Sequence, residues 1–248
     1  MRILLLNANT TAAVTEKIAA EARRVASPGT EVVAVTGTFG APIIGSRAEM
    51  ALAEHAALDL VANHGAGIDA VVIGVSFDVG LRALREVLDV PVVGMTEAAC
   101  LVACTQGGRF GIVTYGPRSA ALFREIVAGY GLAGRLAGVD GIDASPADML
   151  ADPQALHAQI AASACGLIER EGAEVVILAG AVMAGLPPVI QSQVPCPLVE
   201  GIAAATGLAE LLVRLAPAKA QTGSFSKPGA RASEGLSPAL GALLARQS

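Results

Sequence analysis

The sequence predicts an α/β protein of two similar Rossmann-like lobes, each a mainly parallel four-stranded sheet flanked by helices. Short apolar runs alternate with longer helical patterns along the 248 residues, and the order of these segments in the first half recurs in the second. Hydrophobic residues make up 53% of the chain and aromatic residues only 3%. The core must therefore consist of alanine, valine, leucine and isoleucine, which is typical of parallel sheets covered by helices.

Eight apolar runs have the length of strands. They are Arg2–Leu6, Glu31–Thr36, Ala70–Gly74, Pro91–Gly94, Arg109–Thr114, Arg135–Gly138, Val175–Ala179 and Pro197–Val199. Helical patterns separate the runs and follow the last one. They cover Thr11–Val25, Arg47–His64, Phe77–Leu88, Glu97–Cys104, Pro117–Tyr130, Pro153–Glu171 and Gly201–Leu215.

The two halves correspond segment by segment. Residues 3–10 match 111–118, residues 70–78 match 175–184, and residues 91–99 match 197–204. We expect a first lobe of residues 1–106, a second of residues 107–216 whose last helix could cross back to the first, and a C-terminal extension of residues 217–248. A pseudo-twofold arrangement of the lobes would place the carboxyl ends of their strands across a cleft, where ligands commonly bind.

The C-terminal extension has its own character. It carries a net charge of about +3, which leaves about −8 on the rest of the chain. Residues 222–229 are rich in loop-forming residues, and a short helix is predicted at Pro238–Arg246. Its apolar stripe of Leu236, Leu240, Leu243 and Leu244 favours an ordered extension over a mobile tail, because such a stripe needs a surface to cover. We expect it to dock on its own or a neighbouring subunit, in a homo-oligomer.

Composition and spacing argue against several functional classes. Mean hydropathy is +0.59, but no apolar stretch reaches the roughly 18 residues of a membrane span, and the first apolar run is too short for a secretion signal. We expect a soluble cytoplasmic protein. The net charge of −5 argues against a nucleic-acid partner, and no Gly-rich phosphate loop follows the first strand. The four cysteines lack metal-finger spacing. A small molecule is the expected partner.

Four motifs at or near strand ends resemble the aspartate/glutamate/hydantoin racemase superfamily, and its hydantoin and allantoin racemase branch most closely. The family's Asn-Pro-Asn-Thr motif is seen as Asn7-Ala8-Asn9-Thr10, and its Cys-Phe-x-Asp-x-Gly-Leu motif as Ser76-Phe77-Asp78-Val79-Gly80-Leu81, which is one residue shorter. The runs 91–99 and 109–114 also look like family landmarks. The resemblance spans nearly the whole chain.

The resemblance implies a cofactor-free reaction with neither metal nor pyridoxal. In the family, one cysteine thiolate removes the proton next to a carbonyl, and a second thiol returns a proton to the opposite face. Here the first cysteine position is Ser76, and the second falls on Gly180, which has no side chain. A serine hydroxyl is a poor base for a carbon acid without an activating neighbour. The histidines, His55, His64 and His157, are expected on helix surfaces rather than beside Ser76.

The binding half of the predicted site is better preserved. Polar or apolar groups at strand ends are expected to contact the substrate: Asn7, Asn9, Thr10, Pro42, Phe77, Asp78, Thr114, Tyr115, Ala181 and Val182. Asp78, Glu97 and Glu200 could replace the missing acid and base, or could equally cap helix N-termini, where negative charge is favourable. The hydroxyls of Thr114 and Tyr115 are further candidates for proton transfer.

The leading hypothesis is a racemase or epimerase that acts at an acidic C–H bond next to a carbonyl of a small amino acid, hydantoin or related cyclic amide. One alternative is a cofactor-independent decarboxylase, cis–trans isomerase or lyase on a small carboxylate. Another is a ligand-binding relative that has lost its chemistry, which the absence of both thiols would favour.

Overall fold

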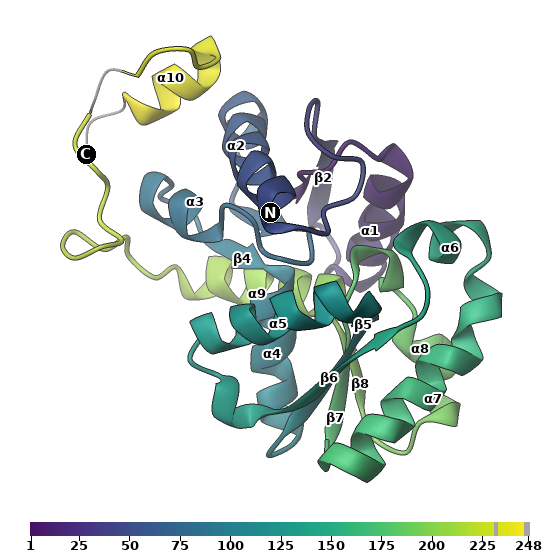
Figure 1. The fold of residues 1–248 in the computed structure, drawn as a ribbon. Helices are drawn as coiled ribbons and strands as arrows, with labels where there is room; N and C mark the ends of the chain where they lie inside the picture. The colour runs from purple at the N-terminus through teal and green to yellow at the C-terminus, as the bar shows by residue number, and fades with distance from the viewer. Residues whose placement is uncertain (231–232, 246–248) are drawn as a thin grey trace. The chain divides into compact units, whose positions relative to one another are not determined.

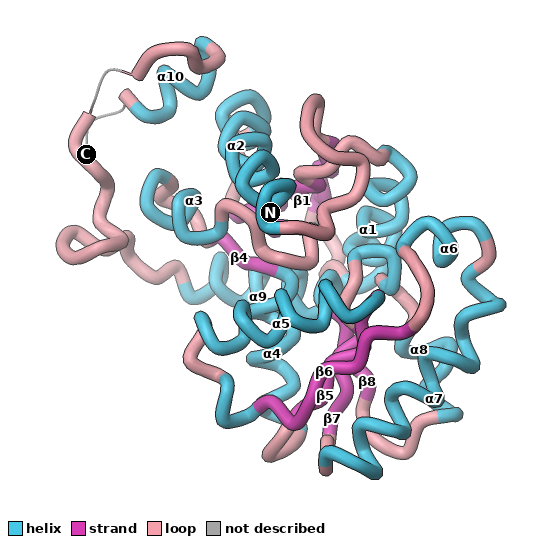
Figure 2. Tube along the Cα trace, in the orientation of Figure 1, coloured by secondary structure: helices cyan, strands magenta, loops and turns pink. Residues whose placement is uncertain are grey.

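The computed structural model describes residues 1–230 and 233–245. Figure 1 shows strands covered by helices, and Figure 2 distinguishes the helices, strands and loops of the same view by colour. The strands are β1 (Arg2–Asn7), β2 (Glu31–Thr36), β3 (Ala70–Ile73), β4 (Val92–Gly94), β5 (Phe110–Tyr115), β6 (Leu136–Ile142), β7 (Val175–Leu178) and β8 (Leu198–Glu200). Every predicted strand is present, with ends shifted by a few residues.

The helices follow the predicted order. They are α1 (Ala12–Val25), α2 (Arg47–His64), α3 (Leu81–Val87), α4 (Met95–Gln106), α5 (Gly116–Gly129), α6 (Pro146–Ala151), α7 (Pro153–Glu171), α8 (Pro187–Ile190), α9 (Gly201–Leu215) and α10 (Pro238–Leu244). Short 3-10 turns lie at η1 (Ala133–Arg135), η2 (Ala181–Met183) and η3 (Gln191–Gln193). The prediction missed α6 and α8. The expected helix end at Arg246 lies outside the described residues.

The strands form two four-stranded parallel sheets with the same order. The first runs β2-β1-β3-β4 and the second β6-β5-β7-β8, so each strand of the first has a counterpart four strands later. The central strands of the first sheet are buried apart from Arg2 at the start of β1, and Val71, Val72 and Ile73 of β3 are each 0% exposed. This confirms the predicted fold class and explains why these runs are continuously apolar.

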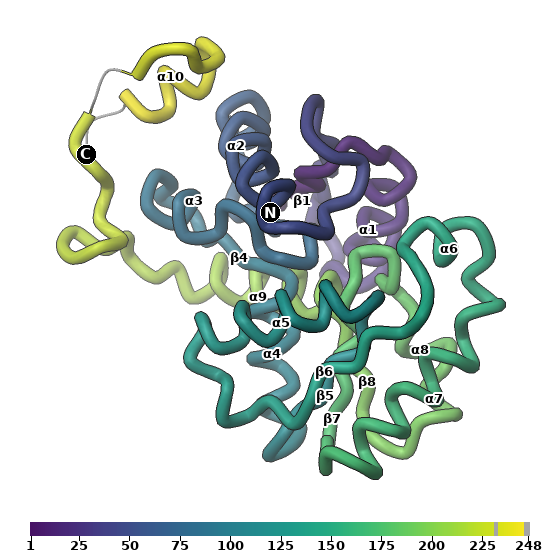
Figure 3. Tube along the Cα trace, in the orientation of Figure 1, coloured from purple at the N-terminus to yellow at the C-terminus, as the bar shows by residue number. Residues whose placement is uncertain are grey.

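Contacts divide the chain into two compact units. Unit 1 consists of Met1–Gly94 and Thr206–Ser248, and unit 2 of Met95–Ala205. The first boundary therefore lies before α4 and not at residue 106, because α4 contacts β5, β7 and β8 of the second sheet. Figure 3 follows the chain by colour from the N-terminus to the C-terminus. Unit 1 is built from two segments that are distant in the sequence.

The C-terminal half of α9 belongs to unit 1 through a buried carboxylate. Glu210 accepts hydrogen bonds from the backbone N–H and hydroxyl of Ser27, at 2.8 and 2.6 Å, and from the Thr30 hydroxyl at 2.6 Å. Burial alone would raise the pKa of Glu210, but these hydrogen bonds and the nearby Arg214 outweigh it and lower the pKa. A carboxylate held by this many donors anchors α9 to the turn between α1 and β2.

The C-terminal extension is ordered over its described residues and packs within unit 1. Helix α10 contacts α2, with Leu240 only 1% exposed and Leu243 only 6% exposed. Ser237 donates a hydrogen bond to Asp59, and Lys227 pairs with Asp89 at 2.5 Å. The leucine stripe thus covers a helix of the same chain.

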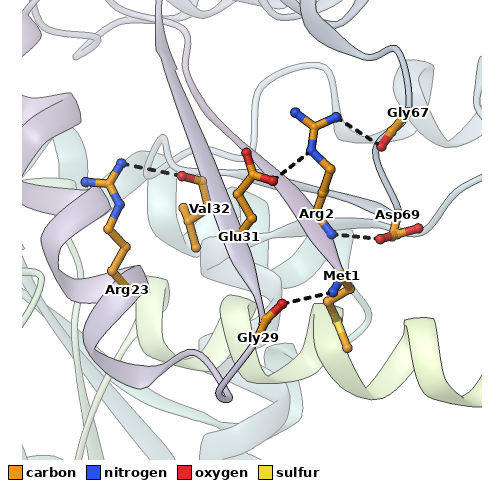
Figure 4. A network of polar contacts seen from close by, with 8 residues as sticks. All are labelled: Met1, Arg2, Arg23, Gly29, Glu31, Val32, Gly67 and Asp69. Atoms are coloured by element: carbon orange, nitrogen blue, oxygen red, sulfur yellow. Dashed lines mark hydrogen bonds and ion pairs between the residues drawn. The ribbon is translucent and has the colours of Figure 1, made fainter.

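The amino-terminal edge of the first sheet is tied together by polar contacts. The backbone N–H of Arg2 donates to Asp69 at 2.7 Å, and its guanidinium pairs with Glu31 at 2.9 Å (Figure 4). The N-terminal amine donates to the carbonyl of Gly29 at 3.3 Å. Because exposed ion pairs contribute little on their own, the main effect is to fix the strand ends at this edge. The opposite, carboxyl edge holds the predicted site residues.

Candidate active site

The polar residues after β1 organise the carboxyl edge of the first sheet. Asn7 is fully buried, and its Nδ2 donates to Asn9 Oδ1 at 2.9 Å, to the Thr11 carbonyl at 3.2 Å and to Thr15 Oγ1 at 2.9 Å. Its Oδ1 accepts from the Asn9 backbone N–H. The Asn7 amide is therefore committed to the loop and to the first turn of α1, and it positions Asn9.

Asn9 has capacity left for a ligand. Its Oδ1 accepts from Asn7 and from the Thr11 backbone N–H at 2.9 Å. Its NH₂ group makes no hydrogen bond within residues 1–230 and 233–245, yet it is not among their enclosed, unpartnered side-chain atoms. Solvent can therefore reach this amide, which leaves two N–H donors for a substrate carbonyl or carboxylate.

The loop after β2 is held against the β1 loop. Thr10 N–H donates to the Ala41 carbonyl at 3.2 Å, and the Thr11 hydroxyl donates to the Pro42 carbonyl at 2.7 Å. The Pro42 ring itself is exposed. These contacts place Thr10 and Pro42, two of the predicted site residues, at the same edge as Asn9.

Ser76 lies in the turn that follows β3. Among residues 71–80 it is the one that is not buried, while Phe77 and Asp78 beside it are only 6% and 5% exposed. The turn is closed by the Asp78 N–H, which donates to the Val75 carbonyl at 2.9 Å. Ser76 is thus the residue of this turn that is partly exposed at the carboxyl end of the strand, where α/β folds commonly bind their ligands.

Asp78 is not a helix residue, contrary to the sequence-based expectation of a helix from Phe77. Its φ is +48°, and Gly80 also has a positive φ of +75°, so α3 can begin only at Leu81. A non-glycine residue in the left-handed region is uncommon and strained. The Asp78 carboxylate lies against Gly94 at the end of β4, in the volume that a Cβ on Gly94 would fill. Gly94 is a site-shaping residue that the sequence analysis missed.

Glu200 is a helix cap. It occupies the position in β8 that corresponds to Gly94 in β4, and it is 3% exposed. Its carboxylate accepts from the backbone N–H groups of Ile202 and Ala203 at 2.7 and 2.6 Å, in the first turn of α9. The capping alternative considered for Glu200 is therefore confirmed. Glu97 lies in the first turn of α4 and is half-buried.

Tyr115 and Gly180 meet at the carboxyl edge of the second sheet. Tyr115 is the last residue of β5, and Gly180 follows the neighbouring strand β7. A Cβ on Gly180 would lie 2.8 Å from Tyr115 Cε2, so the tyrosine ring occupies the space of a side chain at position 180. Ala181 and Val182 follow in η2, whose N-cap is Gly180. Unit 2 thus offers a phenol where the resemblance places the second thiol.

The side-chain hydroxyls of Thr114 and Tyr115 on this edge make no hydrogen bond to the described residues. Tyr115 is 6% exposed, and its hydroxyl is enclosed without a hydrogen-bond partner among the described residues. Thr114 is 2% exposed, and its side chain makes no hydrogen bond in the part of the chain that the structure describes, but its hydroxyl is not among the enclosed atoms. Enclosing a hydroxyl without a partner, as at Tyr115, is costly. Neither hydroxyl is committed to a partner among the described residues.

Burial raises the pKa of the Tyr115 hydroxyl far above its ordinary value. The unfolded chain ionises near pH 10, whereas the folded phenol keeps its proton, so at higher pH the unfolded state binds fewer protons. We therefore predict that the free energy of unfolding falls above about pH 10 by about 1.4 kcal/mol per pH unit, and that this group has no effect below. Urea denaturation of the wild type and Tyr115→Phe in alkaline buffers measures the difference. Equal pH slopes in the two proteins would contradict the prediction.

The remaining titratable candidates lie elsewhere. His55 and His64 are exposed on α2, and His157 is half-buried on α7, as expected. No disulfide joins the four cysteines, and Cys100 is fully buried in α4. In residues 1–230 and 233–245, no cluster of three or more His, Cys, Asp or Glu side chains is arranged to hold a metal ion. Within the same residues, no helix has the length and apolar character needed to cross a bilayer.

Comparisons with known proteins agree with this architecture. The family model for Asp/Glu/Hydantoin racemase matches residues 3–209. The hydantoin racemase of Paenarthrobacter aurescens is 31% identical over 230 residues, which cover 92% of this chain and 98% of the relative. The crystal structure of allantoin racemase from Pseudomonas fluorescens superposes with a TM-score of 0.92 at 37% identity, covering 95% of this chain and 100% of that one. Allantoin racemase from Klebsiella pneumoniae gives 0.91 at 32% identity, covering 97% and 98%.

Proposed function

Because the chain belongs to the Asp/Glu/hydantoin racemase family, we propose that it is a racemase-type isomerase that acts without a cofactor on a hydantoin or related cyclic amide. The relatives named above are hydantoin and allantoin racemases. Substituted hydantoins and allantoin both contain a cyclic ureide ring with a C–H bond next to a carbonyl. Removal of that proton gives an enolate-like anion, and its return to either face interconverts the enantiomers.

The observation that carries the proposal is that each unit, taken by itself, has unengaged hydrogen-bond donors at the carboxyl edge of its sheet. Unit 1 offers the Asn9 amide, and unit 2 offers the Thr114 and Tyr115 hydroxyls. A cyclic ureide has two carbonyl oxygens that accept such bonds, and the one next to the reacting carbon gains negative charge as the proton leaves. Donors fixed in advance by buried strands stabilise that charge at low reorganisation cost.

Proton transfer has to differ from the two-thiol reaction of the family, since we propose that both cysteine positions, Ser76 and Gly180, lack a thiol. Ser76 is the acid/base candidate in unit 1, and the carboxylate of Asp78, whose backbone has a positive φ, follows two residues later. The pKa of a serine hydroxyl lies many units above that of a thiol, so we expect slow exchange. A decarboxylase or lyase on a small carboxylate, which needs only one proton to be delivered, is the second candidate.

Deuterium wash-in tests the function directly. A hydantoin, an amino acid and a malonate are incubated with the protein in D₂O, and we expect deuterium at the α-carbon of the hydantoin together with loss of optical rotation. Release of CO₂ from the malonate would favour the decarboxylase alternative. Saturable binding of these compounds without exchange or turnover would identify a ligand-binding relative and contradict the enzymatic proposal.

The Ser76→Cys variant sharpens this test. A thiol at position 76 restores an acid/base group of near-neutral pKa, and general acid–base catalysis contributes about 10² to 10⁴ in rate. We expect a gain in exchange rate of about 10²-fold. The matched control is Ser192→Cys, which places a thiol on the exposed turn η3 and should leave the rate unchanged. Equal rates for the wild type and Ser76→Cys would contradict the assignment of Ser76 to the reacting position.

A further inference from the structure

The Tyr115 side chain stands where the second thiol of the family would be. Gly180 has an extended backbone, with φ 160° and ψ 127°, which any residue can adopt. The backbone conformation at position 180 therefore does not require glycine. The Tyr115 ring leaves no room for a side chain there, because its Cε2 and Cδ2 lie 2.8 and 3.4 Å from the position of a Cβ on residue 180.

The hydroxyl of Tyr115 is carried by the ring carbon next to Cε2, so it lies close to the space that a thiol on residue 180 would reach. It is enclosed, and no described residue accepts from it or donates to it. Buried tyrosine hydroxyls ordinarily find a hydrogen-bond partner. A strand end that encloses a phenol without satisfying it is a site for a ligand oxygen.

We infer that the Tyr115 hydroxyl donates a hydrogen bond to an oxygen of the substrate, in the space of the missing second thiol, and is a catalytic residue of unit 2. This inference rests on the proposed function, because the oxygen in question is the carbonyl oxygen that becomes anionic when the neighbouring C–H bond ionises. A phenol kept protonated by burial suits a donor to an oxyanion and does not suit a base. No bond to the tyrosine forms or breaks.

The role assigned to Tyr115 is that of a hydrogen-bond donor and not of a base, so it does not depend on which group moves the proton. The chain is then adapted to substrates whose oxygen acceptor lies next to the reacting carbon, as in cyclic ureides and α-substituted carboxylates.

The Tyr115→Phe variant tests the inference, because it removes the hydroxyl and keeps the ring against Gly180. We expect the exchange rate to fall by about 10²-fold, mainly in kcat, as for loss of one oxyanion donor. The Tm should stay the same or rise, since an unpartnered buried hydroxyl is removed. Tyr130→Phe, which changes the other tyrosine of the chain, is the matched control and should keep the wild-type rate. A Tyr115→Phe protein as active as the wild type would overturn the inference and leave the proposed function standing.

If the wild type exchanges deuterium into none of the compounds, a spectroscopic measurement still tests whether the Tyr115 hydroxyl bonds to a ligand. The chain has two tyrosines and no tryptophan, so in Tyr130→Phe the near-ultraviolet absorbance reports Tyr115 alone. Saturation with a hydantoin or a malonate should shift this band if the phenol bonds to a ligand oxygen. A band unchanged by both compounds would overturn the inference, whereas a shifted band without exchange would support it and overturn the isomerase proposal.

Discussion

Replacement of Gly94 by alanine should destabilise unit 1 by about 3 kcal/mol, at the upper end of what overpacking a buried site costs. The new Cβ would overlap the carboxylate of Asp78. That carboxylate has little freedom to move, because Asp78 is buried and its backbone is held at a φ of +48°. Urea denaturation measures the loss, and the exchange assay should show reduced activity as well, since Asp78 shares its turn with Ser76.

Gly207→Ala is the matched control for Gly94→Ala. Gly207 lies in α9 of the same unit, and nothing is within 4 Å of a Cβ placed there. Because alanine is the better helix former, this variant should gain about 0.5–1 kcal/mol. A Gly94→Ala protein as stable as the wild type would show that the Asp78 carboxylate can vacate its position easily.

Asn7→Ala is the second substitution with a large expected effect. It removes an NH₂ group with three acceptors within hydrogen-bond distance and an oxygen that accepts one bond, at a fully buried position, and we expect a loss of about 2–4 kcal/mol. The Asn9 amide would also lose the partner that orients it, so substrate affinity should fall together with stability. Urea denaturation and the KM of the exchange reaction check the two effects.

The comparison for Asn7→Ala is Asn63→Ala on the exposed surface of α2. Asn63 Nδ2 donates to the Asp59 carbonyl of the preceding turn at 2.8 Å, and water can replace that bond. Its removal should change the free energy of unfolding by less than about 0.5 kcal/mol. If both asparagine variants had similarly small effects, the hydrogen-bonded loop after β1 would not be the organising element described here.

The strands could be predicted because their signal is local. A run such as residues 70–73 is apolar throughout and is bounded by turn residues, so its burial on both faces follows from the run itself. The missed helix α6 also had a local signal, because Ser145 followed three residues later by Asp148 is a capping-box pattern. In the structure the Ser145 hydroxyl accepts from the Asp148 backbone N–H, and the Asp148 carboxylate accepts from the Ser145 backbone N–H. The start of α3 was misjudged because positive φ values at Asp78 and Gly80 leave no periodic pattern.

The contents of the site depend on contacts between distant segments. Sequence reasoning identified Tyr115 and Gly180 as members of the site, but their meeting follows from the pairing of β5 with β7. The hydrogen bonds of the Asn7 amide and the packing of the Asp78 carboxylate against Gly94 likewise depend on where these side chains point. The assignment of α4 to the second sheet depends on which surface its apolar residues cover. None of these is encoded in the pattern of a single segment.

The division of unit 1 into two chain segments has a consequence for biosynthesis. All residues of unit 2, Met95–Ala205, are contiguous, so its contacts can form once that stretch has left the ribosome. The first segment of unit 1 is synthesised before unit 2, but the contacts of unit 1 are completed last. Ser27 and Thr30 can bond to Glu210 only after α9 has been synthesised. All four strands of the first sheet therefore exist throughout the synthesis of unit 2, but unit 1 still lacks α9 and α10, and a domain that is incomplete during synthesis is open to misassembly.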